Sequence, residues 1–159
     1  MVVTDSDYQI LKLTDLFFSM YPNPPYTEIL KKKDRAYTCI LFQTHYGYFV
    51  CVPYRSEINH RYAYKFKKSK RSQKHKSGLD YTKIVIIDDV RFIGNKDAII
   101  DKDEYNETVM NIEKIKRGAL NYVDDYIKHT SGVVILHKKE FNRRYAFSTL
   151  KYFHKEMGI

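Results

Sequence analysis

The stretch AYTCILFQTHYGYFVCVPY, residues 36–54, decides the fold class of this chain. Its two ends, Ala36 to Phe42 and Tyr48 to Tyr54, are rich in β-branched and aromatic residues, and a short segment containing Gly47 separates them. Apolar runs of this kind on either side of a glycine-containing turn are typical of a β-hairpin. We therefore expect two antiparallel strands here.

Similar runs before and after the hairpin predict further strands. Tyr8 to Leu13 alternates apolar and polar residues, and Tyr62 to Phe66 repeats an aromatic residue at every second position. Tyr81 to Asp88 contains four consecutive aliphatic residues, as in a strand buried on both faces. Arg91 to Ile93 is expected to add a short strand, and the sheet to end near Gly94.

Helices are expected mainly in the last third of the chain. A short helix begins at Thr14 and Asp15 and ends before Pro22, whereas Lys67 to Gly78 is too polar for an element and is expected to be a mobile basic loop. Apolar residues then recur every three or four positions from Asp103 to Gly132 and from Lys138 to Met157, which predicts two long helices. The order favours an α+β domain, residues 1–159, built on a compact antiparallel sheet or a partly open small barrel.

Length and composition limit the class of protein. The chain has 159 residues, of which 43% are apolar and 15% aromatic, so it can bury a core and is not expected to be disordered. No stretch approaches the roughly 20 apolar residues of a membrane-spanning helix, and Met1 to Leu13 has no leader pattern. Only Cys39 and Cys51 are present, and we expect reduced thiols in a cytoplasmic protein with no membrane partner.

Positive charge is concentrated in one block. Lys31 to Lys83 holds fourteen Lys and Arg against three acidic residues, a net charge of +11, while the rest of the chain has fourteen against sixteen. A localised excess indicates a polyanionic partner, and interleaved aromatic residues suit unpaired bases. The alternative for Tyr62, Tyr64 and Phe66 is a strand that faces the core. The expected RNA-binding residues are Lys31, Lys32, Lys33, Arg61, Lys65, Lys67, Lys68, Lys70, Arg71, Lys74 and Lys76.

The common cofactor and hydrolase motifs are absent. The six glycines form no phosphate-binding loop, and no zinc-peptidase or serine-hydrolase motif occurs, so we expect neither a cofactor nor a metal. One alternative is a Mg²⁺-dependent nuclease, because carboxylates after a strand can hold that ion. Its ligands would come from Asp88, Asp89, Asp101, Asp103 and Glu104; turn and helix-start roles explain the same residues.

RNA can also be cut without a metal. A base takes the proton of the 2′-hydroxyl, cations stabilise the charged phosphorane, and an acid protonates the departing 5′-oxygen, which leaves a 2′,3′-cyclic phosphate. An antiparallel hairpin brings the start of its first strand beside the end of its second. That pairing would gather a candidate catalytic group: Arg35, Tyr37, Arg55, Ser56, Asn59 and His60. A non-catalytic RNA-binding face is the remaining alternative.

Three segments resemble one known family. They are Asp34-Arg35-Ala36-Tyr37-Thr38 before the first hairpin strand, Pro53-Tyr54-Arg55-Ser56, and Ser77-Gly78-Leu79-Asp80-Tyr81. Together they resemble the ToxN/AbiQ family of type III toxins, most closely its CptN branch. The resemblance implies a Kid/MazF-like fold and a metal-independent endoribonuclease that acts on cellular and phage RNA in abortive infection. It also implies inhibition by a repeat-derived pseudoknot RNA antitoxin, which the toxin itself processes and binds in a closed protein–RNA assembly.

Residue roles follow from the resemblance position by position. Ser56 matches the active-site serine of the family, and Arg35 matches a basic residue before the second strand. The lysine that follows the family serine is missing, since Glu57 and Ile58 occupy those positions. We expect Asn59 and His60 to replace it, with His60 able to act as acid or base.

Overall fold

The computed structural model describes residues 8–30, 38–97 and 100–159. Its centre is an antiparallel seven-stranded sheet with the order β4-β5-β3-β2-β1-β7, in which β6 also pairs with β3. This path ends at β4 and β7, so the sheet is open and the α+β prediction is confirmed. The strands are β1 Tyr8–Leu13, β2 Thr38–Gln43, β3 Phe49–Arg55, β4 Ala63–Lys65, β5 Gly78–Asp80, β6 Val85–Ile87 and β7 Ile93–Asp97.

The predicted hairpin forms the middle of this sheet. Strands β2 and β3 pair from Cys39 opposite Pro53 to Gln43 opposite Phe49. Every residue of the two strands is buried except Gln43, Phe49 and Arg55, as their apolar composition requires. The other edge of β3 pairs first with β6 and then, at its carboxyl end, with β5. The end of β3 therefore lies inside the sheet, not at its margin.

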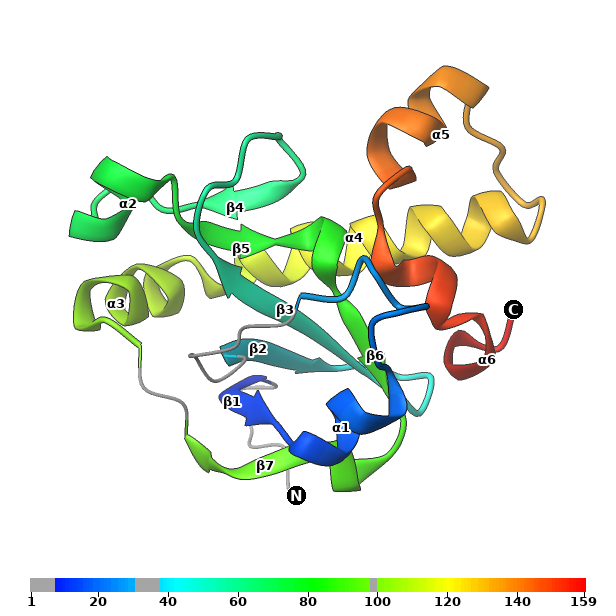
Figure 1. Cartoon of the computed structure of the whole chain (residues 1–159). Helices are drawn as coiled ribbons and strands as arrows, with labels where there is room; N and C mark the ends of the chain where they lie inside the picture. The colour runs from blue at the N-terminus through cyan, green and yellow to red at the C-terminus, as the bar shows by residue number, and fades with distance from the viewer. Residues whose placement is uncertain (1–7, 31–37, 98–99) are drawn as a thin grey trace.

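Helices cover the sheet and extend beyond both of its ends (Figure 1). Helix α4 runs behind the sheet, with α3 and α2 toward one end and α5 toward the other. The helices are α1 Asp15–Met20, α2 Lys70–His75, α3 Lys102–Met110, α4 Ile112–Thr130, α5 Lys138–Tyr145 and α6 His154–Met157, and the 3-10 turns are η1 Tyr81–Lys83, η2 Val90–Phe92 and η3 Thr149–Tyr152.

Two predicted helices are interrupted. The first breaks at Asn111, where the side-chain amide donates to the carbonyl oxygen of Glu107 and so ends α3. The second breaks after Tyr145, because Ser148 caps η3 and the buried hydroxyl of Thr149 donates to the carbonyl oxygen of Ile84 in the sheet. The apolar repeat does not predict these breaks, because the hydrogen bonds are made by polar side chains that are not part of the repeat.

Three further boundaries differ from the sequence prediction. The 67–78 segment is not merely a loop: Ser69 accepts a hydrogen bond from the amide of Ser72 and begins helix α2. The expected strand Tyr81 to Asp88 starts with the 3-10 turn η1, and the sheet continues past Gly94 to Asp97. Predictions made from local polarity and from apolar runs are therefore wrong about the ends of these short elements.

Candidate active site

A buried carboxylate organises the carboxyl end of β3. The Asp80 side chain is fully buried, and Arg55 Nη1 donates to its Oδ2 at 2.7 Å. On Oδ1, the hydroxyl of Thr82 donates at 2.6 Å and the backbone amide of Thr82 at 2.9 Å. His60 Nε2 lies 3.2 Å from the same oxygen. One acid thus joins β3, β5, η1 and the loop before β4.

Hydrogen bonds indicate which nitrogen of the neutral His60 ring carries the proton. The backbone amide of Tyr62 donates to His60 Nδ1 at 3.1 Å, so this nitrogen carries a lone pair. The proton of the neutral ring then resides on Nε2 and points at Asp80. Both ring nitrogens are occupied. In this arrangement His60 holds Asp80 in place, and proton transfer at Nδ1 requires the ring to exchange the Tyr62 amide for another partner.

The Asp80 carboxylate is stabilised in its charged form. Burial by itself raises the pKa of Asp80, but hydrogen bonds from His60, Thr82 and Arg55 outweigh burial and hold the pKa below its usual value. The carboxylate therefore keeps its charge at neutral pH and anchors the Arg55 guanidinium. Arg55 itself is about one-third exposed, so it connects the buried acid with the surface.

Ser56 lies on the other side of the strand end. Its hydroxyl oxygen accepts a hydrogen bond from Arg71 Nε of α2 at 2.8 Å. Successive residues of a strand point to opposite faces, which explains why Arg55 and Ser56 have different partners. Asn59 also contacts the α2 region, because Lys76 Nζ donates to its Oδ1 at 3.2 Å. The structure thus pairs Ser56 with Arg71 and pairs His60 with Asp80.

The basic segment around α2 is fixed to α3. Buried Glu107 accepts hydrogen bonds from the backbone amides of Lys67 and Lys68 and from the hydroxyl of Tyr64. Buried Glu104 accepts from the hydroxyls of Ser69 and Ser77, at 2.9 and 2.6 Å. The expectation of a mobile loop is wrong because these two carboxylates hold both ends of the segment.

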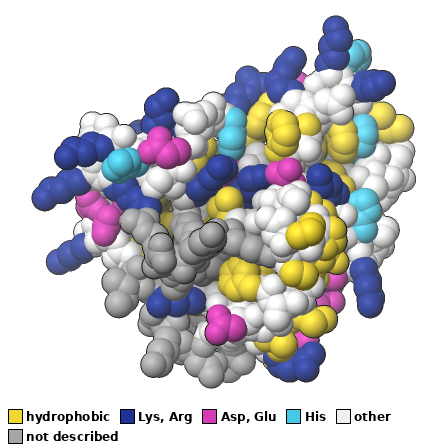
Figure 2. Space-filling model, in the orientation of Figure 1, with side chains coloured by type: hydrophobic (Ala, Val, Ile, Leu, Met, Phe, Trp, Pro, Cys, Tyr) yellow, Lys and Arg dark blue, Asp and Glu magenta, His cyan; other side chains and the backbone are white. Residues whose placement is uncertain are grey.

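Lys and Arg side chains gather on one face of the molecule. Figure 2 shows them over α2, over α5, and in a row across the middle of the face. Helix α2 has no buried residue, so its basic side chains project outward. Tyr64 and Phe66 of the same region are buried in the core, as the strand interpretation predicts, and Tyr62 is half-buried below the guanidinium of Arg61, 5.4 Å from its ring centre.

A cavity of about 320 Å³ opens beside Asp80. Arg55, His60 and Thr82 line one part of it, and Lys83, Arg144 and Phe147 line another. Ser56 lies outside this lining. Helix α5 thereby brings residues distant in sequence to the end of β3.

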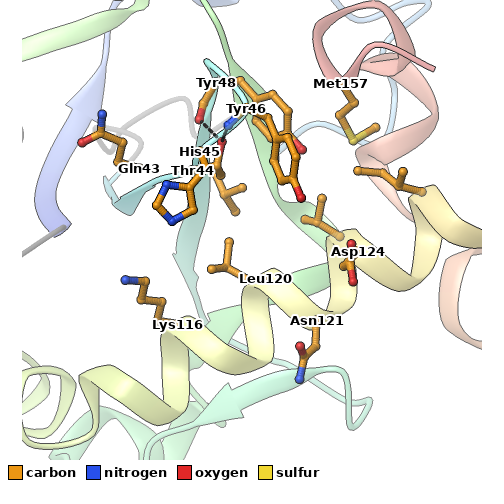
Figure 3. A pocket seen from close by; sticks show the side chains of 13 residues that line it. Gln43, Thr44, His45, Tyr46, Tyr48, Lys116, Leu120, Asn121, Asp124 and Met157 are labelled. Carbon is orange, nitrogen blue, oxygen red and sulfur yellow. Dashed lines mark hydrogen bonds between the residues drawn. The ribbon is translucent and has the colours of Figure 1, made fainter.

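A second cavity, larger than the one beside Asp80, lies between the turn of the β2–β3 hairpin and α4 (Figure 3). It measures about 620 Å³, and Tyr46 and Tyr48 stand across from Leu120 and Asp124 of α4. None of the predicted catalytic or RNA-binding residues lines it. Its apolar floor follows from the packing of the hairpin on α4, so we place the candidate site where the cations gather.

Several predicted residues lie outside the described ranges. Arg35 and Tyr37, expected in the catalytic group, and Lys31, Lys32 and Lys33, expected to bind RNA, all belong to residues 31–37. The approach of Arg35 to Ser56 and the RNA-binding role of the three lysines stay predictions.

Three of the acidic residues considered for Mg²⁺, Asp89, Asp103 and Glu104, accept hydrogen bonds from other residues of the chain. Asp89 accepts from the amide of Arg91 and forms an ion pair with its guanidinium, and Asp101 precedes α3 as its N-cap. Asp103 accepts from the amide of Lys70. Within residues 8–30, 38–97 and 100–159, no group of three His, Cys, Asp or Glu side chains could hold a metal ion.

The predicted site residues include neither Asp80, which links the cluster at the end of β3, nor the arginines that α5 contributes to the same cavity. Asp80 belongs to one of the motifs that carry the resemblance, and it is the one acidic residue between Glu57 and Asp88, which is a signal for it in the sequence. Nothing in the sequence places Arg144 beside Arg55, since the two residues are far apart in the chain.

Comparisons with other proteins found no family model, curated protein or solved structure that matches this chain. Within the described residues, no helix has both the length and the apolar character needed to cross a membrane.

Proposed function

We propose that this chain is a metal-independent endoribonuclease that binds RNA across the carboxyl end of β3. The observation that carries the proposal is the pair of guanidinium groups at this strand end, Arg55 on buried Asp80 and Arg71 on Ser56. Arg55 at the end of β3 and Arg71, which α2 places on the next residue Ser56, suit two successive phosphates of one RNA strand that crosses this strand end.

In the proposed reaction the RNA supplies its own nucleophile. The 2′-oxygen forms a bond to phosphorus as the bond to the 5′-oxygen breaks; the 2′-hydroxyl loses its proton and the 5′-oxygen gains one. Ser56 accepts from Arg71 and retains its own hydroxyl proton, so the pair can donate to the non-bridging oxygens as negative charge develops. Arg55, which Asp80 holds in position, supplies a cation for the neighbouring phosphate of the same strand.

The resemblance supplies the biological part of the proposal. We propose a cytoplasmic type III toxin of the ToxN/AbiQ family with a Kid/MazF-like fold, inhibited by a pseudoknot RNA antitoxin in a closed assembly. Two of the segments that carry the resemblance are neighbours in the sheet, because Tyr54 pairs with Leu79 and Arg55 with Gly78. Their contact supports a shared role for the two motifs.

A second candidate function is RNA binding without cleavage. The occupied ring nitrogens of His60 favour it, as does the presence of Glu57 and Ile58 where the family has a lysine. An acid–base role for His60 therefore remains a prediction.

Ser56→Ala separates the two functions. If the proposal is right, this variant cuts RNA at least about a hundredfold more slowly, because an oxyanion donor is lost, and binds RNA within about twofold of the wild type. Cleavage rates in excess EDTA and affinities from filter binding measure both effects. The matched control is Ser131→Ala, a distant exposed serine, which should cut normally. Wild-type cleavage by Ser56→Ala would overturn the assignment of Ser56.

A further inference from the structure

The cavity beside Asp80 collects cationic side chains from three parts of the chain. Arg55 comes from the end of β3, Lys83 from η1, and Arg143 and Arg144 from α5. Like charges repel one another, so a folded protein brings them together only where acids or an anionic ligand compensate. Each of these side chains has a carboxylate partner within the described residues: Asp80, Glu28, Glu140 and Asp125, respectively.

These ion pairs leave hydrogen-bond donors on two guanidinium groups. Arg55 bonds to Asp80 through Nη1, and Arg144 bonds to Asp125 through Nη2. A guanidinium has five N–H groups in a planar fork. Among the described residues, no other acceptor within hydrogen-bond distance is assigned to either group, so both retain N–H donors beside the cavity. Such donors match the oxygens of a phosphate.

An exposed aromatic ring stands beside these donors. Phe147 lines the cavity, and 72% of its surface is open to solvent. Its backbone carbonyl oxygen accepts a hydrogen bond from Lys83 Nζ at 2.9 Å, which fixes the position of the residue. The ring itself is left as a free apolar face. Such a face stacks on the base of an unpaired nucleotide.

We propose that this cavity binds one unpaired nucleotide of an RNA strand, with its phosphate on Arg55 and Arg144 and its base on Phe147. A volume of about 320 Å³ suits a ligand of this size. The inference rests on the proposed function for one point: if an RNA strand crosses the end of β3 from Ser56 to Arg55, this nucleotide is the neighbour of the scissile phosphate.

Mononucleotide binding tests the inference without requiring cleavage. The wild type is titrated with the four 3′-nucleoside monophosphates and, separately, with inorganic phosphate, by calorimetry or NMR. Arg144→Gln should weaken both kinds of ligand about tenfold, because a charge-assisted hydrogen bond is lost. Phe147→Ala should weaken the nucleotides about fivefold and leave phosphate unchanged, because only the base uses the ring.

Matched controls are Lys139→Gln, an exposed cation of α5, and Val133→Ala, an exposed apolar residue; both should bind like the wild type. The inference is overturned if the nucleotides do not bind, if neither Arg144→Gln nor Phe147→Ala weakens them, or if phosphate binds as well as the nucleotides. Cleavage in EDTA is scored separately. RNA cleavage without nucleotide binding would reject the cavity and keep the proposed function, whereas the reverse result would reject the function and keep the cavity.

Discussion

Asp80 shows how one residue sets the geometry of a whole strand end. Its two oxygens accept hydrogen bonds from Arg55 and Thr82 and contact His60, while its side chain has no exposed surface. A buried carboxylate is costly unless it is fully paired, and here the partners supply both charge and donors. Asp80 therefore both stabilises the fold and positions the Arg55 guanidinium of the candidate site.

Replacement of Asp80 by Asn should be strongly destabilising at neutral pH. The amide group would place N–H donors against Arg55, and the loss of a buried ion pair costs about 3 kcal/mol of the free energy of unfolding. Because the pKa of Asp80 is lowered in the folded state, the carboxylate contributes its full stability above the ordinary pKa of 3.8. That contribution is lost as pH falls through the folded-state pKa.

Urea unfolding of the wild type and Asp80→Asn across pH 7 to pH 3 measures the effect. The difference in free energy should be largest at pH 7 and should narrow below about pH 4. Asp124→Asn is the control, since its ion pair with Lys128 is exposed and contributes little. A difference that stays constant over this range would show that the Asp80 charge does not stabilise the fold.

At this scale the sequence predicts where the candidate residues lie better than it predicts their partners. Hairpin pairing predicts that Arg55, Ser56 and His60 are near the end of the second strand, and Arg55 is the last residue of β3 with Ser56 and His60 in the segment that follows. The separation of Ser56 from His60 was not predictable, since it depends on α2 and β5 approaching from opposite sides. Gly118 is similar: it reads as a weak point in a helix, whereas the Tyr81 ring occupies the space that a Cβ there would need.

Among the elements, α2 differs most from its predicted state. Its six residues, KRSQKH, carry no apolar periodicity and no acidic residue, so nothing in the segment itself predicts a helix that stays in place. The capping serine and the carboxylates of α3 provide the stabilisation instead. A basic surface held rigid in this way loses less entropy when it binds a polyanion.

Glu107→Ala should release this segment. The amides of Lys67 and Lys68 and the hydroxyl of Tyr64 would lose their common acceptor, which should lower the free energy of unfolding by about 2 kcal/mol. Hydrogen exchange gives the local readout: the two amides should become unprotected while those of β2 and β3 stay slow. Glu113→Ala, at an exposed position of α4, should change neither quantity. Continued protection of both amides in Glu107→Ala would contradict the anchoring role of Glu107.

The predicted elements formed where no polar side chain interrupts the pattern, and the two long predicted helices broke where one does. The central hairpin, β1 and α1 form where the sequence indicates, because burial of β-branched and aromatic residues fixes their register. The breaks at Asn111 and Ser148 depend on hydrogen bonds of polar side chains, two of them to nearby backbone atoms and one, from Thr149, to the distant carbonyl oxygen of Ile84. Such bonds leave no trace in a periodic pattern.

For the whole molecule, the distribution of charge matters more than its sum. The described part of the block between Lys31 and Lys83, residues 38–83, includes β3, β4, α2 and β5, and β4, β5 and β3 are neighbours at one end of the sheet. Helix α5 adds Arg143 and Arg144 to the same face from the other end of the chain. The fold therefore concentrates two separate sources of positive charge around the end of β3, an arrangement that suits a polyanionic ligand.

The ends of RNA fragments made in excess EDTA test this account most directly. The purified wild type is incubated with a mixed RNA pool, beside Ser56→Ala, and both the 3′ and 5′ ends of the fragments are mapped. The account predicts 2′,3′-cyclic phosphate and 5′-hydroxyl ends, produced by the wild type alone. RNA that stays intact in EDTA would contradict it: cleavage restored by Mg²⁺ would identify a metal-dependent nuclease, and no cleavage in either condition would identify a protein that only binds RNA.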